Sequence, residues 1–229
     1  HDMGTSSDKA VLVDFGGNII ATAVEPYPTF YPNPAWVEQN PEEWWNAVCR
    51  AIRKALQSGK VCPEEIAGIG IDGQSWSAIP IDKEGKVIAN TPIWMDTRAQ
   101  DICERLNHEI GKDRIFELAG NSLQPSYTTA KIIWYKENLP DMYEKIDKIL
   151  QSNSYIAFKL TGVTSQDLSQ GYGLHCFNMR SGTWDKEMCK LLGIPESFLP
   201  DIVSSDAIVG TVTKKAAAET GLMEGIPVV

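Results

Sequence analysis

The chain has 229 residues, of which 43% are hydrophobic and 22% charged, a composition typical of a soluble globular protein with a substantial core. No apolar run approaches the ~20 residues that a membrane helix needs. Because 30 acidic residues outnumber 21 basic ones, the net charge of −9 provides no broad basic surface for nucleic acid or anionic lipid. A bound anion would have to be held by local backbone dipoles.

The chain contains five cysteines, at positions 49, 62, 103, 176 and 189, and three scattered histidines. No two cysteines have the CxxC spacing of a zinc or redox site, so we expect reduced thiols and a cytoplasmic protein. No secretory signal is visible. The start at His1 and the apolar end at Val229 lead us to expect that both ends are cut.

The first elements in chain order are a hairpin and a helix. Residues 9–25 alternate between apolar and polar around Gly16-Gly17, which predicts two antiparallel strands. We also expect a strand just before Asp2. Apolar residues recur at helical spacing after Asn40, with Asn40 as the N-cap and Pro41 in the first helical position.

Strands and helices then mix. The run IAGIGID predicts a buried strand that ends at Gly73, and a second hairpin is expected around the turn at 83–86. A helix over 95–110 would have Asp96 as its N-cap. The remaining expected elements are helices at 128–139, 140–150, 152–160 and 185–192, and an extended segment at 163–179. This order favours an α/β domain with a mixed sheet flanked by helices.

The segment from Asp2 to Lys9 is the first candidate for chemistry. Gly4 permits close approach of a ligand, while the amides and hydroxyls around Thr5 and Ser6 are suited to phosphate oxygens. Asp2 could hold a hydrated Mg²⁺. The alternative is an ordinary hairpin turn with a surface lysine at Lys9.

A second cluster combines residues 73–76 with residues 93–98. Trp76 and Trp94 offer aromatic faces, and Asp96 offers a carboxylate, which together are typical of a polyol or sugar pocket. The alternative places Trp94 in the core and makes Asp96 a helix cap.

Asp167 lies among small polar residues at 164–173. It could act as a general base toward a hydroxyl, or it could cap a turn or helix. The acidic residues at 2, 72, 96 and 167 also permit a metal-dependent hydrolase in principle, although their spacing specifies none.

Seven segments occur in the order found in one enzyme family: DMGTSSDKAVLVD, WVEQNPEEWW, IAGIGIDGQ, IWMDTRA, SYTTAKIIW, SQDLSQGYG and GTVTKKAAAETGLMEGIPVV. Together they resemble the FGGY family of carbohydrate kinases, and most closely its xylulokinase-like branch. The resemblance implies a ribonuclease-H-like fold of the actin and hexokinase type, with two domains and an active site between them. Residues 1–229 would be the N-terminal domain, and the C-terminal domain would be absent from this chain.

The resemblance also implies roles for individual residues. Asp2 would be the Mg²⁺-associated carboxylate, Asp167 the catalytic base, and ATP and Mg²⁺ the cofactors. The loop that meets the ATP phosphates would consist of Gly4, Thr5, Ser6 and Lys9. The sugar would be contacted by Ser75, Trp76 and Trp94, and by either Ser126 or Tyr127. Gln74 and Asp96, from the second cluster described above, are further candidate sugar contacts.

Two positions depart from the family pattern. Typical xylulokinases have a sequence similar to GQMHG at the positions where this chain has GQSWS, residues 73–77. An indole at Trp76 therefore replaces a histidine and should reshape the sugar pocket. Lys9 stands where many members carry arginine and lacks its bidentate fork. The resemblance implies ATP-dependent phosphorylation of a pentulose or a related sugar or polyol, with the C-terminal domain as partner. A non-catalytic sugar sensor is the alternative, and a homodimer stays open.

Overall fold

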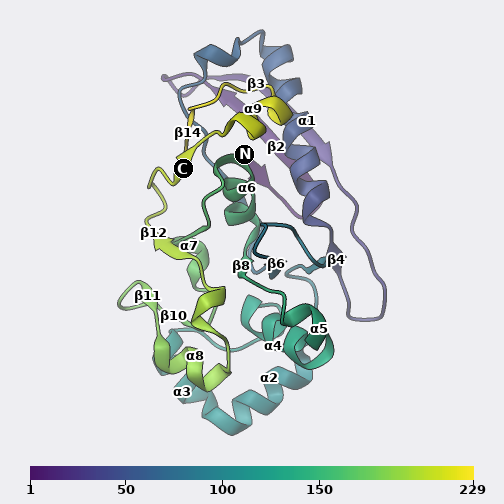
Figure 1. The fold of residues 1–229 in the computed structure, drawn as a ribbon, viewed down its shortest axis with the longest axis vertical. Coiled ribbons are helices and arrows are strands. Elements are labelled where there is room, and N and C mark those ends of the chain that lie inside the picture. Colours follow the sequence, from purple (N-terminus) through teal and green to yellow (C-terminus); the bar gives the residue numbers. More distant parts are fainter.

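The main sheet has four strands in the order β3-β2-β1-β5, and it lies in the upper half of the molecule (Figure 1). These strands are β1 (Asp2–Met3), β2 (Ser7–Val13), β3 (Ile19–Pro26) and β5 (Asp72–Gly73). The computed structural model describes all residues from 1 to 229. Strands β1, β2 and β3 pair antiparallel, whereas β5 runs parallel to β1. The predicted first hairpin and the predicted mixed sheet are therefore confirmed.

Helix α1 (Pro41–Gly59) covers one face of this sheet. The side chain of Asn40 accepts a hydrogen bond from the amide of Glu42 at 3.0 Å, and Pro41 occupies the first turn, as predicted. Small residues at the contact bring the helix close to β2 and β3: Ala10, Ala23, Ala51 and Ala55. Lys60, in the left-handed region with φ of 52°, ends the helix.

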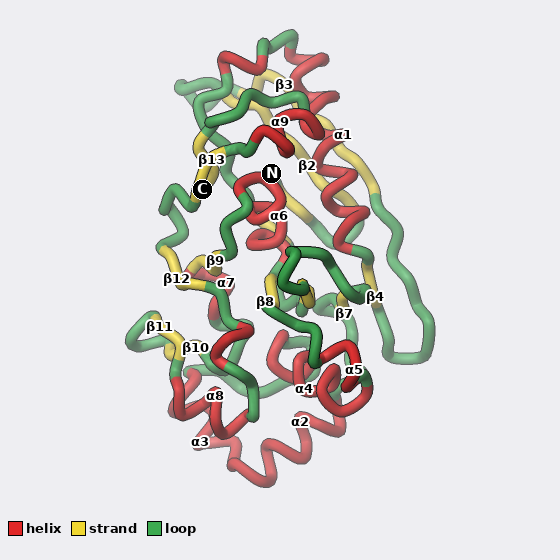
Figure 2. Tube along the Cα trace, viewed as in Figure 1, coloured by secondary structure: helices red, strands yellow, loops and turns green.

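The other strands form short pairs. They are β4 (Glu38–Gln39) with β7 (Thr91–Pro92), β6 (Ile79–Ile81) with β8 (Lys148–Leu150), β9 (Ser165–Asp167) with β12 (Asp201–Val203), β10 (Phe177–Asn178) with β11 (Thr183–Trp184), and β13 (Gly210–Thr211) with β14 (Pro227–Val228). The connection from β3 to β4, residues 27–37, is a long loop along one edge of the molecule (Figure 2).

The remaining helices are mostly short. They are α2 (Gln100–Leu106), α3 (Lys112–Ala119), α4 (Thr128–Asn138), α5 (Pro140–Tyr143), α6 (Ser152–Thr161), α7 (Leu168–Gly171), α8 (Lys186–Leu192) and α9 (Lys214–Thr220), with a π-helix at Asn107–Gly111 and 3₁₀ turns at Pro63–Glu65 and Glu196–Phe198. Helices were correctly predicted at 128–139, 152–160 and 185–192. No helix has the length and apolar character needed to span a membrane.

Several predictions of local structure were wrong. The extended segment expected at 163–179 contains α7, and the strand expected over IAGIGID is reduced to β5. The helix expected from residue 95 begins only at Gln100, and Asp96 is not its N-cap, because the Asp96 carboxylate is used in a buried ion pair. The helix expected over 140–150 ends at Tyr143, and β8 follows. Strand β6 pairs with β8 instead of forming a full second hairpin, in which only Ile81 bridges Val87. Long-range sheet pairing overrode the local helical pattern here.

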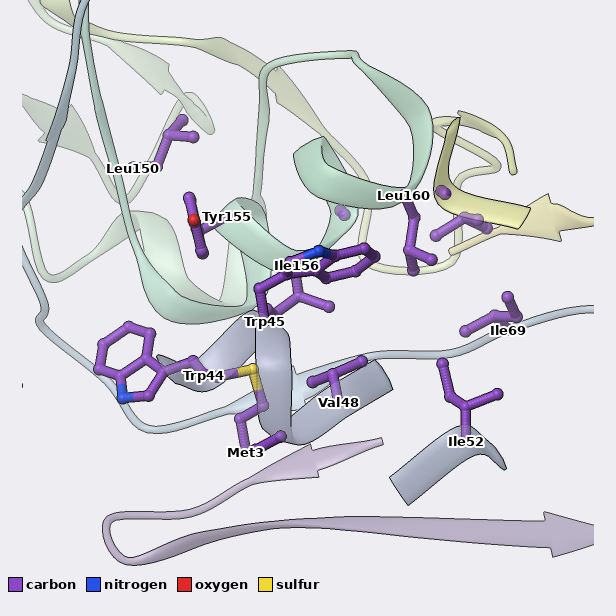
Figure 3. Close-up of a cluster of buried hydrophobic side chains, with 14 of the residues drawn as sticks. Met3, Trp44, Trp45, Val48, Ile52, Ile69, Leu150, Tyr155, Ile156 and Leu160 are labelled. Atoms are coloured by element: carbon purple, nitrogen blue, oxygen red, sulfur yellow. The ribbon is translucent and has the colours of Figure 1, made fainter. Parts of the chain in front are cut away.

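Two hydrophobic clusters hold the molecule together. One of 23 buried residues joins the sheet to α1, α6 and α9, and Figure 3 shows part of it around Met3, Trp44 and Ile156. The other, of 22 buried residues, joins α2, α3, α4 and α8 in the lower half (Figure 1). Residues 73–78 and 91–98, which contain the second group of candidate site residues, contribute to these clusters through Ala78 and Ile93.

Candidate active site

Three charged side chains form a row across neighbouring strands. Asp2 on β1 is in register with Lys9 on β2 and with Asp72 on β5, so all three side chains point to the same face of the sheet. Lys9 Nζ lies 3.1 Å from Asp2 Oδ2, and these two side chains are 48% and 53% exposed. The row is therefore open to a ligand from solvent.

The loop after β1 carries free backbone donors. The amide of Gly4 donates to the carbonyl of Ser7 at 3.0 Å, whereas the amides of Thr5 and Ser6 have no hydrogen-bond partner in the protein. Free adjacent N–H groups in a turn form a concave site for an anion. This arrangement supports the predicted phosphate loop over an ordinary hairpin turn.

The long β3–β4 connection and β4 donate hydrogen bonds to the carbonyl oxygens of the same loop. The hydroxyl of Tyr27 donates to the carbonyl of Gly4, and Gln39 Nε2 donates to the carbonyl of Thr5 at 2.7 Å. Because these contacts use carbonyl oxygens, they fix the loop without occupying its amides. Gln39 was not singled out in the sequence, where it is one polar residue in a short strand.

Trp94 links the phosphate loop to the second cluster. Its indole Nε1 donates to Thr5 Oγ1 at 2.9 Å, and its side chain is 42% exposed. The alternative that Trp94 belongs to the core is therefore wrong. The amide of Gln74 donates to the carbonyl of Met3 at 2.7 Å, and its side chain donates to Gln39 Oε1 at 2.8 Å. Ser75 is half-buried.

Trp76 is held tightly. Its amide donates to Gln151 Oε1 at 3.0 Å, and its backbone has a φ of 69°, in the left-handed region. Its ring centroid lies 4.4 Å from that of Tyr127 and 6.1 Å from that of Tyr172. The structure thus brings together Trp76 and Tyr127, which the sequence proposed separately, and adds Tyr172. Ser126 is half-buried, and it is Tyr127 that contacts Trp76.

A buried lysine fastens the two tryptophan segments together. Lys131 on α4 is fully buried, and its Nζ donates to the carbonyl of Trp76 at 2.7 Å and to the carbonyl of Ile93 at 2.8 Å. Burial lowers the pKa of Lys131 to about 7, against the attraction of the Asp96 carboxylate. The sequence signal was a lysine within the apolar run AKIIW, which was not interpreted as part of the site.

Asp96 lies in a buried ion pair with Arg98. Its carboxylate is fully buried and accepts hydrogen bonds from the amide of Val37 at 2.6 Å, from the amide of Arg98 at 3.0 Å and from Arg98 Nη2 at 2.8 Å. Arg98 also pairs with Glu38 at 2.8 Å. A sugar would have to break this network to reach Asp96, so we assign it to the support of the loop that carries Trp94.

Asp167 lies at the end of β9 and caps α7. It accepts hydrogen bonds from Asn153 Nδ2 at 2.8 Å, from the amide of Ser169 at 2.9 Å and from Ser205 Oγ at 3.1 Å. Burial opposes ionisation, but hydrogen bonds from Ser169, Asn153 and Ser205 outweigh it and lower the pKa of Asp167. The predicted cap is therefore confirmed.

The Asp167 carboxylate also faces open space. It lines a pocket of about 230 Å³ together with Asp72, Asn153, Ser169 and several other small or polar residues. Asp72 in turn stands beside Asp2 in the charged row. A larger groove, of about 690 Å³, is mainly apolar, lies along β2, α1 and residues 61–70, and contains none of the candidate site residues.

The donor set near Asp2 fits Mg²⁺. No group of three or more His, Cys, Asp or Glu side chains is arranged as a protein-only metal cage. Mg²⁺ usually keeps several waters and takes one or two carboxylates plus substrate phosphates. The neighbouring carboxylates of Asp2 and Asp72, next to free amides, match that requirement.

Comparisons with known proteins place the whole chain in one enzyme family. The model of the FGGY family of carbohydrate kinases, N-terminal domain, matches residues 1–229. A glycerol kinase from Thermococcus gammatolerans is 34% identical over 218 residues, which cover 93% of this chain and 44% of the relative. A xylulose kinase from Bacillus subtilis is 30% identical over 223 residues, covering 97% of this chain and 44% of the relative.

Solved structures show the same relation. The xylulose kinase from Rhodospirillum rubrum superposes with a TM-score of 0.94 at 28% identity, covering 99% of this chain and 46% of that one. The chain thus spans less than half the length of these relatives. The neighbours are sugar kinases of the actin and hexokinase type, which confirms the predicted fold class. With its whole length matched by the family model, the chain belongs to the FGGY family of carbohydrate kinases, as an N-terminal domain.

Proposed function

We propose that the protein containing this chain transfers the γ-phosphoryl group of ATP to a hydroxyl of a small sugar or polyol. The observation that carries the proposal is the position of Asp167, whose ionised carboxylate lines a pocket that it shares with Asp72, next to Asp2 and the free amides of the 4–6 loop. The site therefore combines a base with an anion cradle. The chain's C-terminal partner domain would supply the remainder of the ATP site.

In this mechanism Asp167 accepts a hydrogen bond from the acceptor hydroxyl and orients it toward the γ-phosphorus. Because the transition state of phosphoryl transfer is loose, positioning and charge stabilisation matter more than early deprotonation. A carboxylate with a lowered pKa suits this role, since it remains ionised and takes the proton late.

The phosphate side stabilises the charge that spreads over the transferred group. The free amides of Thr5 and Ser6 and the ammonium of Lys9 would donate to its oxygens. Asp2, together with Asp72, would hold Mg²⁺ through water, and the bound ion would neutralise phosphate charge. ATP binding would draw Lys9 away from its 3.1 Å ion pair with Asp2.

The acceptor side is the aromatic wall of Trp76, Tyr127 and Trp94. Apolar C–H faces of a sugar pack on such rings while hydroxyls form hydrogen bonds. The relatives include xylulose and glycerol kinases, and a neighbouring structure is named a gluconate kinase. We therefore infer a pentulose or a related sugar or polyol as acceptor, selected by the indole at position 76.

The test is ADP formation by the full-length protein with ATP and Mg²⁺ over xylulose, glycerol and gluconate, with the product identified by mass spectrometry. We expect acceptor-dependent ADP and one phosphorylated acceptor. The matched control is Asp201→Asn, at an exposed aspartate outside the site, which should leave the rate unchanged. Acceptor binding without transfer would favour the sensor, and phosphate release from sugar phosphates would favour the hydrolase.

We also infer a cytoplasmic location, supported by five cysteines that form no disulfide in the structure. The homodimer stays a prediction, and the sedimentation of the full-length protein would test it.

A further inference from the structure

Trp76 is in an unfavourable conformation. A non-glycine residue with φ of 69° is uncommon, and a bulky one more so. The indole Nε1 is in addition buried without a hydrogen-bond partner, a state that carries a desolvation penalty. Such a residue persists only where its surroundings fix it, and strain of this kind concentrates at functional sites.

The surroundings fix Trp76 through both its backbone and its ring. Gln151 Oε1 accepts from its amide, and Lys131 Nζ donates to its carbonyl. Gln151 also donates through Nε2 to the carbonyl of Gln170 at 2.7 Å, so α7, which directly precedes Tyr172, is bound to the same support. The rings of Tyr127 and Tyr172 then pack edge-on against the indole.

Gly173, which directly follows Tyr172, completes this enclosure. A Cβ atom on Gly173 would lie 2.6 Å from Trp76 Cδ1, closer than real contacts allow. Gly173 does not have a positive φ, so its backbone conformation would accept an alanine. The other atoms near such a Cβ, Gln151 Oε1 and the carbonyl oxygen of Gln170, lie at the ordinary contact distance of 3.4 Å, so the need for glycine comes mainly from the indole.

We propose that Gly173 is a specificity-determining residue, because its missing side chain provides the space in which the Trp76 indole forms the acceptor wall. The acceptors concerned are small polyhydroxylated molecules with an apolar C–H face. A side chain at position 173 displaces the indole, and the pocket then favours a different acceptor. This inference rests on the proposed function, since it assigns acceptor selection to that site.

The test is a double-variant cycle in the full-length protein: wild type, Gly173→Ala, Trp76→Ala and the double variant. Kd and KM are measured for xylulose, glycerol and gluconate, and KM for ATP. In the wild-type background Gly173→Ala should raise the Kd for the preferred acceptor about ten-fold and change the order of preference among the three acceptors. The KM for ATP should stay within about two-fold of the wild-type value. In the Trp76→Ala background the same change should have less than about a two-fold effect.

The matched control is Gly70→Ala, because a Cβ on Gly70 meets no atom within 4 Å. It should change neither acceptor preference nor thermal stability. If Gly173→Ala alone fails to fold, the double variant should fold, because removal of the indole restores the space.

The proposal would be overturned if Gly173→Ala had equal effects in both backgrounds or left acceptor preference unchanged. It would also be overturned if KM for acceptor and KM for ATP changed in parallel, or if the double variant also failed to fold. If the protein binds acceptors but transfers no phosphoryl group, the proposed activity fails, and the acceptor Kd values still decide the role of Gly173. If it binds none of the three, the proposal for Gly173 is overturned as well.

Discussion

The two sides of the candidate site are built in opposite ways. The proposed phosphate side is one continuous segment, Asp2 to Lys9, in which the side chains of Asp2 and Lys9 are exposed and the amides of Thr5 and Ser6 are free. The proposed acceptor side is formed by segments from across the chain, and Trp76 within it packs against α4 and the residues after α7. A charged, extended ligand such as a nucleotide phosphate needs open dipoles, whereas selection among similar sugars needs a rigid wall.

The two sides touch at a few defined contacts. Trp94 Nε1 donates to Thr5 Oγ1, and the amide of Gln74 donates to the carbonyl of Met3. Lys131 fixes the segments that carry Trp76 and Trp94 relative to each other. A change on one side should therefore affect mainly one ligand, unless it breaks one of these links.

The largest effect is expected at Asp167, which we propose as the base for the transfer reaction. Asp167→Asn keeps the side-chain shape but removes the base, so kcat should fall by about 10²–10⁴-fold with acceptor affinity within a few-fold. Steady-state kinetics of the full-length protein measures this, with Asp201→Asn as the control. An unchanged kcat would remove Asp167 from the catalytic role.

Lys131→Met tests whether the stability of the protein depends on the two buried hydrogen bonds of Lys131. It leaves the carbonyls of Trp76 and Ile93 without a donor, so the variant should lose about 2 kcal/mol or more of the free energy of unfolding. Chemical denaturation measures the loss. A variant as stable as the wild type would show that these hydrogen bonds contribute little.

The pH dependence of the same variant supplies a second readout. The pKa of Lys131 is lowered from 10.5 to about 7 in the folded protein. Between about pH 7 and pH 10.5 this lysine is therefore more protonated in the unfolded state than in the folded state. The wild type should gain stability relative to Lys131→Met as pH rises from about 7 toward 10.5, by at most about 1.4 kcal/mol per pH unit. A constant difference across this range contradicts a lowered pKa.

Trp76→His is expected to have a moderate and selective effect. The smaller ring enlarges the pocket, so the preference among xylulose, glycerol and gluconate should shift by about ten-fold. Competition assays between pairs of acceptors measure the shift. An acceptor profile identical to the wild type would remove Trp76 from the pocket wall.

Lys9→Ala should have the smallest effect. The side chain is half-exposed, and its ion pair with Asp2 is screened by solvent, so folding stability should change little. KM for ATP should rise about three- to ten-fold with acceptor KM unchanged. Lys9→Arg should restore most of the affinity, and a loss of acceptor binding instead would contradict the assignment.

The sequence predicted the backbone geometry of residues 2–9 well because that geometry is local. A two-strand hairpin and a Gly-containing turn determine where Asp2, Thr5 and Lys9 lie, and the Asn40 cap placed α1 correctly. Asp167 was proposed as a base or as a cap; the structure shows the cap and places its carboxylate in a pocket that suits the base.

The acceptor side could be predicted only in part, because long-range contacts define it. Trp76 and Tyr127 were predicted as site residues. Lys131 was not, because it lies among apolar residues of a helix and its partners are distant in the sequence. Tyr172 and Gly173 lie in a segment that was expected to be extended, and nothing in its pattern indicated contact with Trp76. The full set of partners of Asp96 could not be predicted, because the amide of Val37 comes near it only in the folded chain.

The most direct test of this division is a side-by-side kinetic comparison of Trp76→His and Lys9→Ala in the same full-length protein, with KM measured for both ATP and acceptor. We predict that Trp76→His changes acceptor KM alone and that Lys9→Ala changes ATP KM alone. This division would be contradicted if either variant changed KM for ATP and KM for the acceptor equally, or if Trp76→His changed only KM for ATP and Lys9→Ala only KM for the acceptor. Either result would mean that the phosphate side and the acceptor side are not separate.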